Sequence, residues 1–220
     1  MAFPGRVQDQ VAGMLIGIAL FFLMLLTPET GVETAVGLVL TVFFSIYLFM
    51  GGAMEERLGR LAYALLGAFY LGYLMPHWVL LFRLPQGRDW VIFVLAVIMS
   101  GDTVAYFVGK HFGGRKLAPR ISPGKTVEGA VGYVVGSVVA AMLAGQFLNI
   151  RLALFELLAL SLILSVFGQL GDLFESWIKR VFAVKDSGMG LPGHGGFMDR
   201  LDSLILPAVV TTTYLKVFHP

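Results

Sequence analysis

The sequence predicts an all-α polytopic membrane protein with about seven transmembrane helices, forming a single transmembrane domain over residues 1–220. Three observations lead to this prediction. Hydrophobic residues make up 57% of the chain and charged residues only 14%, with a mean hydropathy of +0.82, which is unlike a soluble domain. Apolar runs long enough to cross a bilayer recur along the chain. Lysine and arginine are also distributed unevenly between alternate connections.

The apolar runs place the spans at about 11–26, 32–50, 58–81, 90–109, 127–148, 152–177 and 202–218. The first run is short, roughly 24 Å at 1.5 Å per residue. It follows Arg6, as a signal peptide would, but no small-residue cleavage site comes after it. We therefore expect a helix that is retained.

The positive charges predict the orientation of these spans. Twelve of the sixteen lysines and arginines fall on one side when the connections alternate, and the other side carries only Arg83, Arg88, Arg151 and Lys216. Because cytoplasmic loops are enriched in lysine and arginine, the N-terminus and both long polar loops are expected in the cytoplasm. The chain contains no cysteine, which excludes disulfides and thiolate metal sites.

Residues 1–99 are expected to be mainly structural helices, residues 100–203 a catalytic core and residues 204–220 the last helix. Small residues at helical spacing occur at Gly13 and Gly17, and again at Ala64, Ala68 and Gly72. Such rows let helix backbones approach closely in lipid, so we expect these residues to pack helices together.

The stretch 100–129 is the first to suggest chemistry. Asp102 lies inside an apolar span, where a carboxylate costs roughly 2.5–3.5 kcal/mol on insertion scales and marks a functional candidate. A structural alternative is that it pairs with Lys110 or caps a helix. Gly124-Lys125-Thr126 is not a P-loop, because Pro119 stands where that motif needs glycine. Lys125 nevertheless precedes a predicted helix, whose N-terminus favours phosphate. An alternative role for the lysines and arginines of this loop is to anchor it to anionic lipid headgroups.

The stretch 171–203 mixes acids, bases and glycines in a way that suits a metal ion and phosphates together. Carboxylates bind hard cations, lysine and arginine neutralise phosphate oxygens, and glycines let amide groups approach anions. Asp172, Glu175, Ser176 and Lys179 are spaced to share one face of a helix. The alternative without a function is a solvated loop that connects two membrane helices.

Both stretches resemble the phosphatidate cytidylyltransferase (CDP-diacylglycerol synthase) family. The second contains S-x-x-K-R, K-D-S-G, L-P-G-H-G-G and D-R-x-D-S in the order of the family signature, with matches at Ser176, Lys179, Arg180, Lys185, Asp186, Pro192, His194, Gly195, Gly196, Asp199, Arg200 and Asp202. The first contains D-[ST]-x-A-Y-x-x-G-[KR], K-L-A-P and S-P-x-K-T-x-E-G, with matches at Asp102, Ala105, Tyr106, Gly109, Lys110, Lys116, Leu117, Ala118, Pro119, Ser122, Pro123, Lys125, Thr126, Glu128 and Gly129.

The resemblance implies a nucleotidyltransferase that forms CDP-diacylglycerol and pyrophosphate from CTP and phosphatidate, for phospholipid synthesis. It implies Mg²⁺ at Asp172 and Asp199, assisted by Asp202 or Asp102, and a second, monovalent ion such as K⁺. Phosphates would be held by Lys179, Arg180, Lys185, Lys125 and Arg200. Substrate contacts are also expected from Thr126, Lys116, Ser122, Ser176, Asp186, Ser187, Gly195 and Gly196. His194 would bind metal or phosphate, or shape its loop by a hydrogen bond.

The expected location is the bacterial inner membrane, with the active site facing the cytoplasm, and the resemblance suggests a homodimer. No nucleic acid partner is expected. The closest alternative is a CTP-dependent enzyme acting on a polyprenol or an ether-lipid phosphate. A membrane transporter is a more distant one, because transporter charges usually lie at the bilayer midplane.

Overall fold

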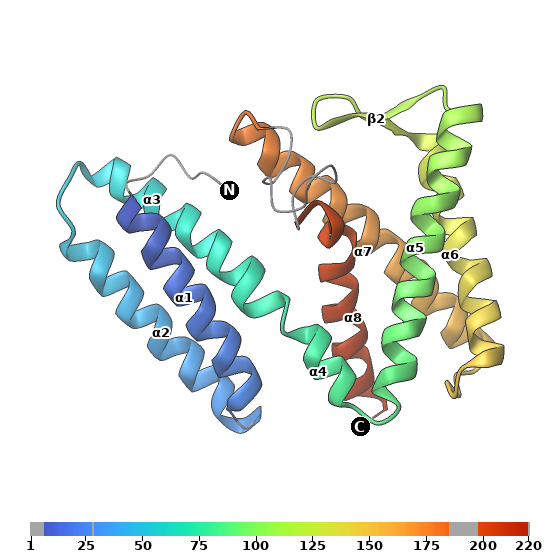
Figure 1. The fold of residues 1–220 in the computed structure, drawn as a ribbon, viewed down its shortest axis with the longest axis horizontal. Helices are drawn as coiled ribbons and strands as arrows, with labels where there is room; N and C mark the ends of the chain where they lie inside the picture. Colours follow the sequence, from blue (N-terminus) through green and yellow to red (C-terminus); the bar gives the residue numbers. More distant parts are fainter. Residues whose placement is uncertain (1–6, 28, 185–197, 220) are drawn as a thin grey trace. The chain divides into compact units, whose positions relative to one another are not determined.

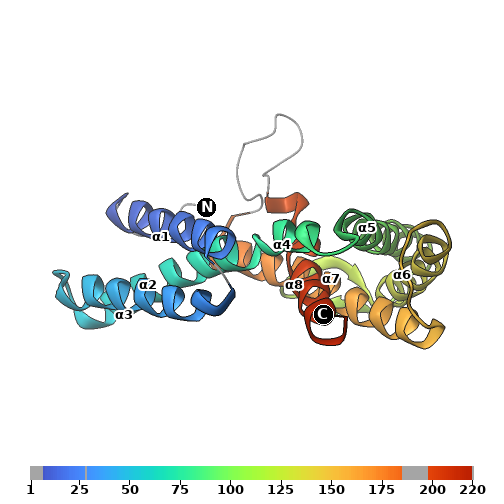
Figure 2. The ribbon, with the colours of Figure 1, turned by 90° about the horizontal axis from the view of Figure 1, so that it is seen from below.

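A computed structural model of the chain describes residues 7–27, 29–184 and 198–219. The chain divides into two compact units, one up to Leu80 and one from Leu81 onward. Figures 1 and 2 show their helices from two directions. The predicted catalytic core, residues 100–203, falls entirely within the second unit.

The first unit consists of helices that pack through small residues. Its elements are α1 (Val7–Leu26), α2 (Glu29–Phe49), α3 (Met54–Gly67), the π-helical segment η1 (Ala68–Leu74) and the start of α4 (His77–Arg83). A Cβ atom added to Gly17 would lie 3.5 Å from the Cα of Ala68, and one added to Gly72 would collide with the backbone of Gly17. The two small-residue rows therefore pack against each other, and the predicted role of these residues in helix packing is confirmed.

The second unit contains the remaining helices and one small sheet. Its elements are α5 (Gly87–Phe112), β1 (Lys116–Ala118), β2 (Ser122–Thr126), α6 (Val127–Phe147), α7 (Leu154–Val181), the 3₁₀ turn η2 (Met198–Arg200) and α8 (Asp202–Phe218). Helices α5 and α6 lie side by side, and α7 contacts both α6 and α8 (Figure 1). Gly132 and Gly136 make the close approach of α6 to α5 possible, since a Cβ on Gly136 would lie 2.8 Å from the Cγ2 of Val104.

The connection between α5 and α6 differs from the predicted all-α protein, because it forms an antiparallel β-hairpin. Lys116 pairs with Thr126 and Ala118 with Ser122. The amide of Val127 donates to the carbonyl of Arg115 over 2.9 Å, which closes the base of the hairpin. The strands have three and five residues, so a search for long alternating patterns does not detect them.

The helices have the dimensions of membrane spans. Among the described residues, five segments are long and apolar enough to cross a bilayer, at Gly31–Phe49, Met54–Arg83, Gly87–Phe112, Val127–Phe147 and Leu154–Val181, and Val11–Leu26 is a shorter apolar helix. The chain is therefore a multi-pass membrane protein. The predicted count of seven spans stays a prediction, because α8 has 17 residues and the apolar segment Val11–Leu26 of α1 is also shorter than the five candidate spans.

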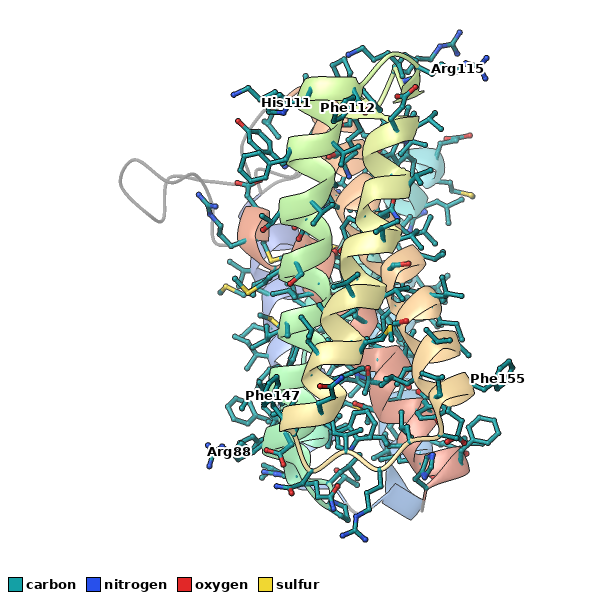
Figure 3. All side chains as sticks on the ribbon, turned by 90° about the vertical axis from the view of Figure 1, so that its right-hand side faces the viewer. Arg88, His111, Phe112, Arg115, Phe147 and Phe155 are labelled. Atoms are coloured by element: carbon teal, nitrogen blue, oxygen red, sulfur yellow. The ribbon has the colours of Figure 1, made fainter. Side chains whose placement is uncertain are left out.

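Exposed apolar side chains cover the outward face of α6. Val131, Val135 and Val139 are exposed at four-residue intervals, while Gly132, Tyr133 and Gly136 face the other helices. Figure 3 shows His111 and Arg115 at one end of the α5–α6 pair, and Arg88 and Phe147 at the other. Charged residues thus mark the ends of an apolar belt, as expected for helices in lipid.

Candidate active site

A pocket of about 460 Å³ lies at the hairpin end of the second unit. Helices α5, α6 and α7 and the hairpin all contribute to its wall. The lining residues are Asp102, Ala105, Tyr106, Gly109, Lys110, Leu117, Ser122, Gly124, Lys125, Thr126, Gly129, Ala130, Tyr133, Gln169 and Asp172. Small apolar residues and the rings of two tyrosines thus share the wall with charged and polar side chains, a combination that ligand sites use to bind and orient a molecule.

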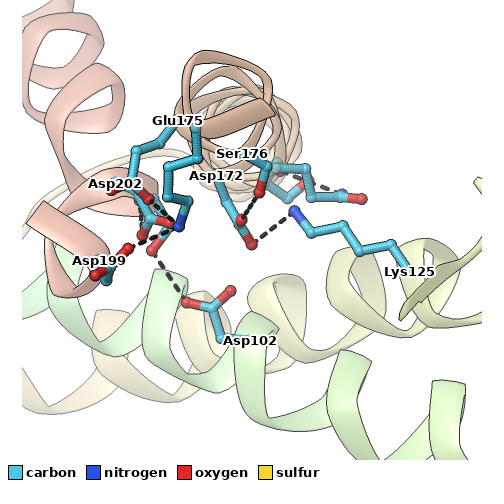
Figure 4. Close-up of polar contacts among 11 residues, drawn as sticks. Asp102, Lys125, Asp172, Glu175, Ser176, Asp199 and Asp202 are labelled. Carbon is cyan, nitrogen blue, oxygen red and sulfur yellow. Dashed lines mark hydrogen bonds and ion pairs between the residues drawn. The ribbon is translucent and has the colours of Figure 1, made fainter. Parts of the chain in front are cut away.

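An ion pair joins the hairpin to α7 across this pocket. Lys125 Nζ lies 2.6 Å from Asp172 Oδ2, and both side chains keep some contact with solvent (Figure 4). Ser176, one turn further along α7, donates a hydrogen bond of 3.4 Å to the other carboxylate oxygen of Asp172. The sequence predicted each of these residues as a site residue, and the structure brings them together.

A second cluster is centred on Lys179 in the last turns of α7. Its ammonium group lies 3.0 Å from Glu175 Oε2 and 2.7 Å from Asp199 Oδ1, so it joins α7 to η2. The side chain of Glu175 is completely buried, with 0% exposure, and its Oε1 atom has no hydrogen-bond partner within the part of the chain that the structure describes. Asp202, at the start of α8, lies beside Glu175 (Figure 4).

Asp102 links the pocket to α8. It lines the pocket from α5, and its Oδ2 accepts a hydrogen bond of 3.2 Å from the hydroxyl of Ser203. The Oδ1 of Asp202 accepts from the amide of Ser203 over 2.7 Å, which satisfies one of the free N–H groups at the beginning of α8. The predicted alternative that Asp102 pairs with Lys110 is not seen.

Local contacts hold the hairpin against the helices. The carboxylate of Glu128 accepts from the amides of Gly114 and Arg115, over 3.0 and 3.2 Å. Thr126 caps α6, because its hydroxyl accepts from the amide of Gly129 over 3.1 Å. Arg180 Nε donates to the carbonyl of Ile121 at the hairpin turn, over 3.2 Å. These hydrogen bonds fix the position of the hairpin, which holds Lys125 beside Asp172.

The oxygen donors of the site suit a hard cation such as Mg²⁺. In the described residues, no three acidic or histidine side chains converge as a ready-made metal cage. Mg²⁺ is usually held by only one or two carboxylates, with water and substrate phosphates completing its shell. Asp172 and Asp199 keep partial solvent contact and fit that pattern, although each is paired with a lysine.

The remaining predicted site residues have different placements. Ser122 lines the pocket, whereas Lys116 points to solvent on β1 and does not line it. Thr126 is buried and serves as a helix cap. Arg200 is exposed in η2. Six predicted residues lie outside the described part of the chain, namely Lys185, Asp186, Ser187, His194, Gly195 and Gly196.

Three residues at the site carried no predicted role. The sequence placed Glu175 on the polar face of its helix but gave it no role. Its spacing of four residues from Lys179 is typical of an ion pair on a helix, and the structure contains that pair. Gln169 and Tyr133 line the pocket from α7 and α6. No local pattern singles out Tyr133, because it follows a glycine stripe on a helix with apolar residues all round.

Comparison with known proteins shows which family the chain resembles. The model of a family described as "Cytidylyltransferase family" matches residues 3–218. A phosphatidate cytidylyltransferase of Bacillus subtilis is 38% identical over 198 residues, which cover 87% of this chain and 74% of the relative. Proteins of the same name from Staphylococcus saprophyticus and Brucella abortus are 48% and 42% identical over 120 and 134 residues. Those matches cover 54% and 61% of this chain, and about half of each relative, 46% and 49%.

Proposed function

The chain belongs to the cytidylyltransferase family, and on this premise we propose that it transfers the cytidylyl group of CTP to phosphatidate. The products would be CDP-diacylglycerol, a precursor for phospholipid synthesis, and pyrophosphate. The observation that carries the proposal is the pocket itself. It combines a lysine at its hairpin end with carboxylates that reach into an apolar helix bundle, so a soluble nucleotide and a lipid headgroup could meet there.

The proposed reaction exchanges one phosphorus–oxygen bond for another. An oxygen of the lipid phosphate forms a bond to the α-phosphorus of CTP, and the bond from that phosphorus to the bridging oxygen of the β-phosphate breaks. The electron pair leaves with pyrophosphate. A phosphate monoester is already ionised at neutral pH, so no general base is required.

The principal barrier is electrostatic, because two anions must approach each other. Each pair of unit charges at 4 Å repels by about 4 kcal/mol at an effective dielectric constant near 20. Lys125 is positioned to offset this repulsion, since it lines the pocket just before the N-terminus of α6. Lys179, Arg180 and Arg200 lie on the neighbouring ends of α7 and η2, and we assign them to phosphate oxygens as well.

Mg²⁺ is the cofactor that we propose for this site. Asp172 and Asp199 would hold it, with Asp202 or Asp102 assisting directly or through water. When bound, the ion would neutralise developing charge on the phosphate oxygens. A second, monovalent ion such as K⁺ and a homodimer are further parts of the proposal.

We also propose that the pocket faces the cytoplasm from the bacterial inner membrane, with the N-terminus on the same side and about seven spans. The support is the uneven distribution of lysine and arginine, of which twelve of sixteen lie on the proposed cytoplasmic side. CTP is made in the cytoplasm, so an opening on that side would give the nucleotide access.

The experiment is to supply the purified protein with CTP and phosphatidate and to measure both pyrophosphate and the CDP-lipid. Product should require Mg²⁺ and should fall at least a hundredfold in Asp172→Asn and Asp199→Asn. Glu55→Gln, which changes an exposed carboxylate on α3, should retain activity. Product from a polyprenyl or ether-lipid phosphate alone would assign a different lipid. No turnover of CTP with any lipid would refute the enzyme proposal.

A further inference from the structure

Tyr133 occupies a slot that two glycines create between three helices. Its ring lies against Gly101 of α5, where an added Cβ atom would stand 2.6 Å from Cε1 and 2.7 Å from Cδ1. Its hydroxyl lies against Gly168 of α7, where an added Cβ atom would collide with the phenolic oxygen. Any larger residue at either glycine would displace the ring. The position of the hydroxyl is therefore set by packing on both sides.

The hydroxyl of Tyr133 has no hydrogen-bond partner among the described residues. Tyr133 is only 3% exposed, yet it lines the same pocket as Asp102 and Asp172. A buried tyrosine hydroxyl normally finds a partner, and leaving one unpaired costs about 1–3 kcal/mol. Phenylalanine would fill this slot without that cost. Tyr133 thus brings an unpaired, buried hydroxyl to the wall of the pocket.

The position of Tyr133 along α6 indicates which substrate the hydroxyl meets. Tyr133 lies six residues after Val127, the first residue of α6, which corresponds to about 9 Å along the helix axis. Lys125 lies on the hairpin just before α6, at the end where charged residues gather. A soluble nucleotide reaches the hairpin end first, whereas a lipid presents its headgroup from the side of the hydrocarbon.

We propose that Tyr133 is a lipid-binding residue whose hydroxyl donates a hydrogen bond to an oxygen of the phosphoglycerol part of the lipid substrate. The inference rests on the proposed function, because it takes a lipid phosphate as one of the two substrates. It gives a role to Tyr133, which lines the pocket together with the polar residues Asp102 and Gln169. The lipid headgroup would thereby be held at a fixed depth below Lys125.

The test is Tyr133→Phe, which removes one oxygen atom and keeps the ring in its slot. We expect the KM for phosphatidate, measured at saturating CTP, to rise about tenfold, the equivalent of about 1.4 kcal/mol. The KM for CTP should change less than twofold. The apparent Tm of the substrate-free protein should stay the same or rise, because an unpaired buried hydroxyl has been removed. Tyr214→Phe removes a phenol from α8 outside the pocket and should alter neither KM.

Each other outcome has a definite meaning. An unchanged KM for phosphatidate in an otherwise active variant would overturn the inference, and so would a rise in the KM for CTP alone. A fall of several degrees in the apparent Tm would show that the hydroxyl is structural. If the unmodified protein turns over no CTP, the proposed function fails. The contact of Tyr133 with lipid is then tested by the change in apparent Tm that phosphatidate vesicles cause. A smaller shift for Tyr133→Phe than for the unmodified protein would support lipid contact, and an equal shift would refute it.

Discussion

Removing the ammonium group of Lys179 should destabilise the protein, because the buried Glu175 would lose the cation that pairs with it. Glu175 is 0% exposed, and Lys179 and Asp199 are 16% and 17% exposed. Breaking a buried ion pair by removing one partner costs about 3–5 kcal/mol. We take the lower end for Lys179→Met, since two of the three side chains keep some solvent. At about 2–4 °C per kcal/mol for a chain of this size, the apparent Tm should fall by about 6–12 °C.

The assay is thermal unfolding in detergent, followed by tryptophan fluorescence at one fixed scan rate because unfolding of such a protein need not be reversible. Adding Glu175→Gln to Lys179→Met should restore more than half of the lost Tm, since the buried charge is then gone. Lys116→Met, which changes an exposed lysine on the hairpin, should shift the Tm by less than about 2 °C. A Lys179→Met protein as stable as Lys116→Met, or a double variant no more stable than Lys179→Met, would refute this reasoning.

Two further predictions concern the hairpin and the helix that follows it. Thr126→Val keeps the size of the side chain but removes the hydroxyl that caps α6, so it should cost about 1 kcal/mol and lower the apparent Tm by about 2–4 °C. Thr103→Val, which removes a hydroxyl from the exposed face of α5, should have a smaller effect, and equal shifts would argue against the cap. Lys125→Met should raise the KM for CTP at least tenfold and reduce its dependence on salt, because a cation at the pocket is lost. A KM for CTP that matches that of Lys116→Met would contradict a role for Lys125 in phosphate binding.

The helices were the most predictable part of the fold, because hydropathy reports directly on segments that must lie in lipid. The last predicted span, 202–218, coincides with α8, and the span at 127–148 ends one residue beyond α6. The spans at 90–109 and 152–177 ended too early, since α5 and α7 continue to Phe112 and Val181. Their final turns carry polar residues, which remain helical although they lower the hydropathy. Hydropathy therefore marks the apolar part of a helix and not its end.

The hairpin was not predictable from local pattern, because contacts with other elements stabilise it. Its second strand contains proline and glycine, which are poor strand formers. The carboxylate of Glu128 binds the amides before β1, and Arg180 of α7 binds the carbonyl of Ile121 at the turn. These contacts depend on where α6 and α7 lie. A pattern within the loop alone gives no sign of them.

The site divides in the same way into local and long-range parts. Helical periodicity correctly placed Asp172 with Ser176, and Glu175 with Lys179, because residues four apart are neighbours on a helix. The contact of Asp102 with Ser203 joins residues 101 positions apart, and no local pattern predicts it; the charge distribution placed both loops on one side of the membrane, and the resemblance to a known family assigned them to one site. The slot of Tyr133 depends on glycines from two other helices, so it became visible only in the assembled structure.

The position of the charges along the helices distinguishes an enzyme from a transporter. Asp199 and Asp202 lie where α8 begins, Lys179 lies in the last turn of α7, and Lys125 immediately precedes α6. Transporters usually place their substrate site near the bilayer midplane, on helices that are interrupted there. In this unit Lys125, Lys179, Asp199 and Asp202 lie at or just beyond helix ends, whereas Asp102 and Asp172 lie within α5 and α7, which continue as single helices through these positions. Uninterrupted helices beside a hairpin therefore suit the proposed reaction between a soluble nucleotide and a lipid headgroup better than they suit transport.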